Sequence, residues 1–208
     1  MERLLCDSEE SVFFLNSTEN ESRANAFYQK ALYLDIEGMA EAGDKYAQAC
    51  LGYMYQFGCG VDQNKSTTVK WYRKAAEQGY AIAQDHLGDM YYWGDGVYQN
   101  YSTAVKWYRK AAEQGHADVQ NRLGHMYRNG DGVDQNYLTA MEWHRKAAEQ
   151  GHVYAPRYLG EFYEYGSGVE KNYSTAVEWY RKAVGKGDFA AQRNLDRLTQ
   201  SPRKKKRL

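Results

Sequence analysis

A nine-residue segment recurs at a fixed interval and constrains what this chain can fold into. It reads Trp-Tyr-Arg-Lys-Ala-Ala-Glu-Gln-Gly at 107–115, and close copies lie at 71–79, 143–151 and 179–187. Their tryptophans fall at positions 71, 107, 143 and 179, so each copy begins 36 residues after the previous one. A spacing this regular indicates an array of equivalent supersecondary units, each burying its apolar face against its neighbours.

Each unit contains two helical patterns. In the second unit Ala83, Leu87, Met90 and Tyr91 have the spacing i, i+4, i+7, i+8, which is one face of an α-helix. We call this first helix of each unit helix A. It is predicted to end at Gly94, because a residue without Cβ can adopt the left-handed cap conformation. The equivalent glycines of the other units are Gly58, Gly130 and Gly166.

The second helix of each unit, helix B, is predicted from about 101 to 114 in the second unit, with Asn100 as its N-cap. Its predicted buried face is Ala104, Val105, Tyr108, Ala111 and Ala112. A glycine recurs in the middle of helix A, at Gly52, Gly88, Gly124 and Gly160. Because glycine is unfavourable inside a helix, we expect it to allow close approach of helix B, with the tryptophan filling the neighbouring gap.

The repeat divides the chain into four full units with a half-unit at each end. The expected parts are an N-terminal segment, poorly ordered or forming a short helix, over 1–21; a capping half-repeat over 22–43; units over 44–79, 80–115, 116–151 and 152–187; a capping helix over 188–199; and a disordered basic tail over 200–208. Pro156 stands where the other units have glutamine, so the fourth helix A is predicted to start late, near Tyr154.

Composition favours a cytoplasmic protein. The three cysteines, Cys6, Cys50 and Cys59, do not recur with the repeat, so no disulfide is expected to staple each unit, as in a reducing compartment. The N-terminus lacks a signal-peptide pattern, and no apolar run approaches the roughly 18 residues of a membrane helix. The net charge of zero conceals an acidic excess over residues 1–44 and five consecutive basic residues at 203–207.

The basic tail leaves several interpretations open. It resembles a short nuclear-import signal, which would place the protein in the nucleus of a eukaryotic cell, natively or as a delivered bacterial effector. It could equally be a solubilising terminus or contact nucleic acid or acidic lipid through charge alone. With no aromatic residues interleaved, specific nucleic-acid recognition is not expected.

The shared pattern is Ala-x-x-x-Leu-Gly-x-Met-Tyr-x-x-Gly-x-Gly-Val, followed by Ala-x-x-Trp-Tyr-Arg-Lys-Ala-Ala-Glu-Gln-Gly. It resembles the Sel-one-like repeat, a relative of the tetratricopeptide repeat, over about residues 40–199. The resemblance implies an all-α, right-handed α/α superhelix that serves as an adaptor for other proteins. Some bacterial members with paired cysteines in every unit are linked to penicillin binding and β-lactam hydrolysis. Only the first unit here has two cysteines, so that link does not carry over.

Positions that vary between units while sharing one face of helix A are the candidates for partner binding. They have the spacing i, i+3, i+7, i+10 and lie roughly opposite the core face, on the helix expected to line the concave surface. The candidate residues are Tyr53, Gln56, Asp85, Asp89, Tyr92, Asn121, His125, Arg128, Tyr154, Arg157, Glu161 and Glu164. Aromatic and arginine side chains are the strongest candidates, because such residues dominate interface energetics. The alternative is that these are unconstrained surface positions.

Metal binding is not expected. Asp89, His125 and Glu161 occupy equivalent positions in successive units, a set of positions that we call a column. Helices in successive units pack about 8–10 Å apart, whereas zinc ligands lie about 2.0–2.2 Å from the metal. His116 and His152 directly follow a terminating glycine and are interpreted as helix-start capping residues. The segment 131–134 lacks the alternating oxygen ligands of a calcium loop.

No catalytic residue or cofactor is predicted. The Gly-x-Gly-Val loops join helix to helix and lack a Gly-Lys-Ser/Thr ending, so they are interpreted as turns rather than phosphate-binding loops. No nucleophile stands near a histidine and a carboxylate in a recognisable motif, and nothing near Cys59 argues for a reactive thiol. We therefore predict a non-catalytic, monomeric scaffold for a protein or peptide partner. A β-lactam-processing hydrolase and a nuclear effector are the alternatives.

Overall fold

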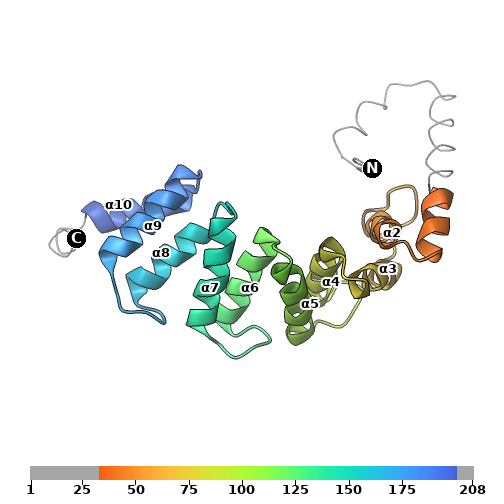
Figure 1. Ribbon diagram of the computed structural model, residues 1–208, viewed down its shortest axis with the longest axis horizontal. Helices are drawn as coiled ribbons and strands as arrows, with labels where there is room; N and C mark the ends of the chain where they lie inside the picture. Colours follow the sequence, from red (N-terminus) through yellow and green to blue (C-terminus); the bar gives the residue numbers. More distant parts are fainter. Residues whose placement is uncertain (1–32, 201–208) are drawn as a thin grey trace, which may run out of the picture. The chain divides into compact units, whose positions relative to one another are not determined.

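The computed structural model describes residues 33–200, and these form helices joined by short loops, with no strand among them (Figure 1). Residues 33–41 are helical. The helices that follow are α2 (Lys45–Phe57), α3 (Lys65–Glu77), α4 (Ala81–Trp93), α5 (Tyr101–Glu113), α6 (Ala117–Asn129), α7 (Tyr137–Glu149), α8 (Ala155–Tyr165), α9 (Tyr173–Gly185) and α10 (Phe189–Gln200). The fold is therefore all-α, built from helix pairs with a 36-residue period, as in an α/α solenoid.

The caps that the sequence predicts are confirmed. The side chain of Asn64 accepts a hydrogen bond from the backbone N–H of Thr67 at the start of α3, at 3.0 Å. Gly58 ends α2 in the left-handed conformation, with φ of 76°. The equivalent asparagines at the starts of α5, α7 and α9 and glycines at the ends of α4, α6 and α8 behave in the same way. Local sequence thus fixes where these helices begin and end.

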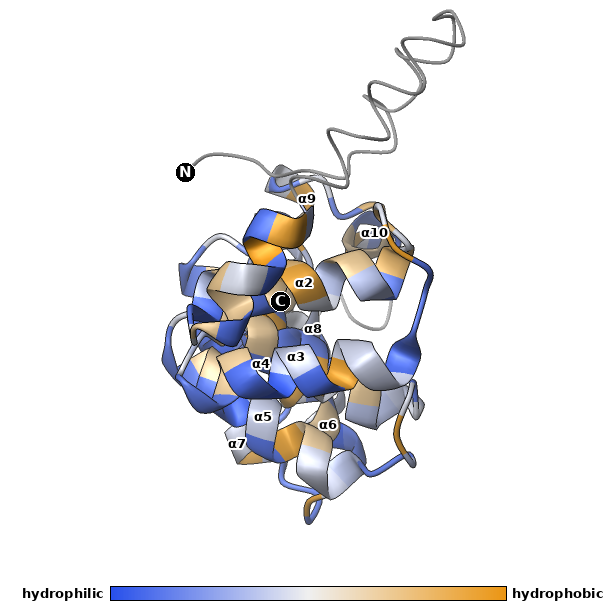
Figure 2. Ribbon diagram, turned by 90° about the vertical axis from the view of Figure 1, so that its right-hand side faces the viewer, coloured by the Kyte–Doolittle hydropathy of each residue, from blue (hydrophilic) through white to orange (hydrophobic). Residues whose placement is uncertain are grey.

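The described residues also form two larger compact units, which are distinct from the 36-residue repeats and which we call unit 1 and unit 2. Unit 1 ends at Gln99, and unit 2 begins at Asn100. In unit 1 the buried side chains of Leu51, Met54 and Trp71 form a cluster with Ile36. In unit 2 the clusters lie between α7 and α8 and between α9 and α10. Each helix carries both apolar and polar stretches, as amphipathic helices do when one face is buried (Figure 2).

A tyrosine ring, not a tryptophan, occupies the space over the mid-helix glycine. A Cβ built on Gly52 would lie 2.7 Å from Cδ1 of Tyr72, and one on Gly160 would lie 2.6 Å from Cε1 of Tyr180. The glycine therefore admits helix B as predicted, and the ring directly over it is a tyrosine. Trp71, predicted to fill the neighbouring gap, is buried in the same cluster as Leu51 and Met54. The ammonium of Lys74 lies 4.3 Å from the ring centre of Trp71.

The late start of the fourth helix A is also confirmed. α8 begins at Ala155 with Pro156 in its first turn, two residues later than the register of α2, α4 and α6 requires. Proline is tolerated there because the first N–H groups of a helix have no partner within the helix. In the other units a buried glutamine holds this column, and Gln48 donates to the backbone oxygen of Ala40.

The C-terminal helix α10 follows Asp188, whose side chain accepts hydrogen bonds from the backbone N–H groups of Ala190 and Ala191. Asp196 occupies the column of the mid-helix glycine and accepts a hydrogen bond from Gln192. The expectations for the N-terminal segment, for the first part of the 22–43 half-repeat and for the basic tail lie outside residues 33–200.

Candidate functional site

Three columns of helix A point away from the core. With about 100° of rotation per residue, Tyr53 and Phe57 lie within about 20° of Tyr46 around α2. Ala49 and Gln56 lie about 60–80° further round, toward neighbouring helices. We call the residues equivalent to Tyr46, Tyr53 and Phe57 the outer line of helix A. Its first and third columns are exposed in every unit and its second is half-buried in every unit.

The third column of the outer line was missed by the sequence analysis. It consists of Phe57, Trp93, Asn129 and Tyr165, each directly before the glycine that ends helix A. Trp93 is 72% exposed, an unusual position for so large an apolar side chain. A spacing of 11 residues, three helical turns, from the column of Tyr46 is the signal that could have identified it.

In unit 1 the outer line is rich in aromatic residues. The rings of Tyr53 and Phe57 lie 4.5 Å apart, and Tyr46 contacts Tyr80 edge-on at 5.2 Å. On α4 the exposed residues are Ile82 and Trp93. Tyr92 packs edge-on against Trp93 at 4.7 Å. These helices therefore present apolar rings to solvent instead of burying them.

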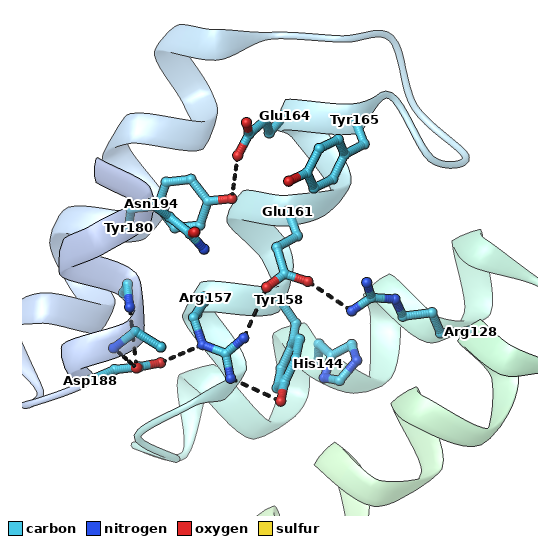
Figure 3. A network of polar contacts seen from close by, with 12 residues as sticks. Arg128, His144, Arg157, Tyr158, Glu161, Glu164, Tyr165, Tyr180, Asp188 and Asn194 are labelled. Carbon is cyan, nitrogen blue, oxygen red and sulfur yellow. Dashed lines mark hydrogen bonds and ion pairs between the residues drawn. The ribbon is translucent and has the colours of Figure 1, made fainter. Parts of the chain in front are cut away.

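In unit 2 a network of charges lies beside the outer line and includes its residue Glu161 (Figure 3). Arg157 donates from Nε to Asp188 at 2.8 Å and from Nη1 to Glu161 at 2.9 Å. Glu161 also accepts from Arg128 at 2.8 Å. Two guanidinium groups and two carboxylates thus connect α6, α8 and the start of α10. Burial alone would lower the pKa of Arg157, but Tyr158 and the two carboxylates raise it above its ordinary value.

Glu164 and Asn121, two candidate residues, are buried rather than presented on the surface. The Glu164 side chain is 1% exposed, accepts from the hydroxyl of Tyr180 at 2.8 Å and pairs with Arg197 of α10. Asn121 contacts the buried ring of His144. Glu164 and Asn121 face adjacent helices, so the surface stripe of helix A is narrower than the sequence predicted.

The other candidate residues keep some exposure. Tyr154 is exposed, and the half-buried candidates are Tyr53, Gln56, Asp85, Asp89, Tyr92, His125, Arg128, Arg157 and Glu161. Gln56 accepts a hydrogen bond from the hydroxyl of Tyr72 at 2.8 Å, so it supports the packing of helix B. The structure therefore brings Arg128, Arg157 and Glu161 together, and Tyr154 is the most exposed of the aromatic candidates.

The histidine columns behave differently from one another. His152 caps the start of α8, with Nδ1 accepting from the backbone N–H groups of Tyr154 and Ala155. His116 makes no equivalent side-chain cap bond. Burial, with Arg128 and Arg157 nearby, lowers the pKa of His125 to about 4. No group of three metal-ligating side chains occurs within residues 33–200.

Two further features bear on the expectations from composition. Cys50 is a free, half-buried cysteine, and burial raises the pKa of its thiol. Cys59 is disulfide-bonded, which differs from the reduced state that the cysteine pattern favoured. Among residues 33–200, no helix has the length and apolar character needed to cross a membrane.

Comparisons with known proteins identify the repeat. The Sel1 repeat family matches residues 15–35, 45–80, 81–116, 117–152 and 154–188. A Sel1 repeat protein from Oxalobacter formigenes is 40% identical, with a TM-score of 0.78 over 86% of this chain and 73% of that protein. Helicobacter pylori cysteine rich protein B is 25% identical, with a TM-score of 0.50 over 64% of this chain and 96% of that one. No curated protein sequence matches.

A protective antigen of uropathogenic Escherichia coli strains, which displays a Sel1-like repeat fold, is also 40% identical, with a TM-score of 0.75. The match covers 79% of this chain but only 36% of that antigen, so this chain spans about a third of its length. Helix pairs with glycine and asparagine caps, a 36-residue period and a family match over most of the sequence lead to one conclusion. The chain belongs to the Sel1 repeat family.

Proposed function

We propose that this chain is a non-catalytic scaffold that binds a partner protein or peptide on the outer line of helix A. Sel1-like repeat domains are typically protein-interaction scaffolds, which supports the general class. The observation that carries the proposal is the exposure of Tyr46, Phe57, Ile82 and Trp93 on α2 and α4. Aromatic side chains at such positions are the usual energetic centres of protein interfaces.

The contrast between core and outer columns supports this proposal. The core leucines of helix A, such as Leu51, Leu87 and Leu159, are fully buried and identical in every unit. The outer line changes from aromatic residues in the first unit to Asp118, His125 and Asn129 in the third. Packing of the core requires the same leucine in every unit, but it does not determine which residues stand in the outer line. The outer line is therefore where partner specificity can reside.

The test is capture of binding proteins from a native lysate with the tagged full chain, followed by mass spectrometry. The test variant carries Phe57→Ala and Trp93→Ala, which remove two exposed rings. The matched control carries Tyr98→Ala and Leu138→Ala, which remove two exposed large apolar side chains outside the outer line. A partner held by the wild type and the control but lost by the test variant supports the proposal. Equal retention by both folded variants would contradict it.

The absence of catalysis is part of the same proposal and has its own test. The alternative is β-lactam hydrolysis of the kind linked to repeats with paired cysteines. Purified protein incubated with the chromogenic β-lactam nitrocefin should show no hydrolysis above a heat-inactivated sample. Turnover that persists through purification would favour the hydrolase over the scaffold.

A further inference from the structure

The third unit departs from the others at one fully buried position of helix B. The equivalent residues are Tyr72, Tyr108, His144 and Tyr180. Where tyrosine is present in α3 and α9, its hydroxyl donates to an acceptor on helix A, Gln56 or Glu164. In the third unit the residue at that acceptor column is Arg128, whose guanidinium can only donate. A tyrosine hydroxyl at 144 would thus lack its usual acceptor.

His144 holds its single proton in a defined place. Its side chain is 0% exposed, and Nδ1 lies 3.0 Å from Oδ1 of Asn121. An amide oxygen only accepts, so Nδ1 carries the proton and Nε2 does not. Nε2 is buried with no hydrogen-bond partner, so a second proton on Nε2 would have nothing to accept it. A Cβ built on Gly124 would lie 2.8 Å from Cε1 and Nε2 and 2.9 Å from Cδ2, so the face of the ring packs closely against α6.

The surroundings of this ring oppose a positive charge (Figure 3). The ring of Tyr158 stacks on it at 5.0 Å, and His125 approaches edge-on at 4.9 Å. The charged groups nearby are Arg128 on α6 and Arg157 and Glu161 on α8, with His152 in the loop before α8. Glu161 is already bonded to both arginines. Burial first, and then the neighbouring histidine and arginine charges, lower the pKa of His144 well below its ordinary value.

We propose that His144 makes the packing of α6, α7 and α8 in the third unit sensitive to acid, so that these helices separate in mildly acidic solution. We call this pH-dependent packing the lock. In the packed state His144 stays neutral, whereas in the opened state water surrounds the ring and it takes up a proton at an ordinary pH near 6.5. For each group that binds a proton only in the opened state, the equilibrium constant for opening rises by up to tenfold for every pH unit below about 6.5. The lock stands whether or not the outer line binds a partner.

Hydrogen–deuterium exchange of the full chain tests the lock. Opening constants for amides of α6, α7 and α8 are compared at pH 7 and pH 5, after correction for the intrinsic exchange rate. His125 and His152, whose pKa values burial also lowers, contribute further protons to the same opening. His144→Phe keeps a ring without a titratable nitrogen, so it should reduce the acid-induced increase by about 25-fold relative to wild type. The control, His116→Gln, should leave the increase unchanged.

An equal acid-induced increase in wild type and His144→Phe would overturn the proposal. His144→Tyr, which restores the residue of the other units, gives a second test if the phenylalanine variant does not fold. If neither folds, nuclear magnetic resonance of the wild-type imidazole decides. A ring that titrates with a midpoint near pH 6.5 while α7 stays protected would overturn the lock. A ring that stays neutral until α7 loses protection supports it.

Discussion

The ring of Tyr180 lies so close to Gly160 that a Cβ on the glycine would come within 2.6 Å of ring carbon Cε1. The tyrosine is fully buried, and its hydroxyl donates to the buried carboxylate of Glu164 one turn further along α8. Glycine and tyrosine thus form one packing unit between helix A and helix B. Tyr72 and Gly52 repeat this arrangement in unit 1.

Gly160→Ala should destabilise unit 2 by about 1–3 kcal/mol, because the added methyl group overpacks against a ring held by its hydrogen bond. The gain in helix propensity, at most about 1 kcal/mol, offsets only part of this cost. Gly185→Ala is the matched control, since a Cβ there meets no atom within 4 Å. Urea denaturation followed by circular dichroism measures both. A neutral Gly160→Ala would contradict the packing argument.

Tyr180→Phe should cost more than Tyr72→Phe. Glu164 is an almost fully buried carboxylate, so losing the hydrogen bond from the tyrosine hydroxyl should cost about 1.5–3 kcal/mol. Gln56 is half-buried and can turn toward water, so its loss should be about 0.5–1.5 kcal/mol. The two variants are compared by urea denaturation. The reverse order of stabilities would show that burial of the acceptor does not set the cost.

Asp188 combines two roles that substitutions can separate. Its carboxylate caps α10 and accepts from Arg157. Asp188→Asn keeps a capping oxygen but weakens the ion pair, whereas Asp188→Ala removes both and should cost about 1–2 kcal/mol more than the asparagine variant. Thermal unfolding of the two proteins measures the difference. Equal melting temperatures would mean that capping contributes nothing at α10.

The cap at His152 predicts a dependence on pH. Burial lowers the pKa of His152 despite the opposing charge of Asp118, so the folded state binds fewer protons than the unfolded state. Its contribution is therefore complete above about pH 6.5 and is lost as the pH falls through that value toward the lower folded pKa. His152→Asn supplies a capping oxygen that does not titrate.

The melting temperature of His152→Asn should fall less between pH 7.5 and pH 5 than that of the wild type. The measurement is a series of thermal unfolding curves across this range. His116→Asn serves as the control, because His116 occupies the same column without a side-chain cap bond. Parallel curves for wild type and His152→Asn would show that protonation of the cap does not matter.

Much of the fold could be predicted because its signals are local. Asn100 caps α5 and Gly94 ends α4 through contacts with atoms only a few residues away, so short stretches of sequence determine these boundaries. Pro156 delays α8 for the same reason, since its ring acts on its own turn. The 36-residue period adds the information that one such unit must stack on the next.

The candidate site was harder to predict because it depends on contacts between units. Glu164 and Arg197 are 33 residues apart, and so are Arg128 and Glu161. Nothing in a single helix shows that a charge at one column meets its opposite in the next unit. The exposed column of Phe57 and Trp93 could have been found from helical geometry, but only the burial of neighbouring columns shows that it faces outward.

The sequence by itself determined the helix pairs, their caps, their core columns and their repeat, because these follow from helical periodicity and interactions within a few residues. The tertiary structure alone decided which polar side chains remain at the surface, which are used as links between helices, and that a tyrosine fills the glycine gap. The physical reason is that burial and ion pairing depend on the distance between side chains brought together by stacking. His144 shows this most clearly, since its buried, unpaired nitrogen exists only where α6, α7 and α8 meet.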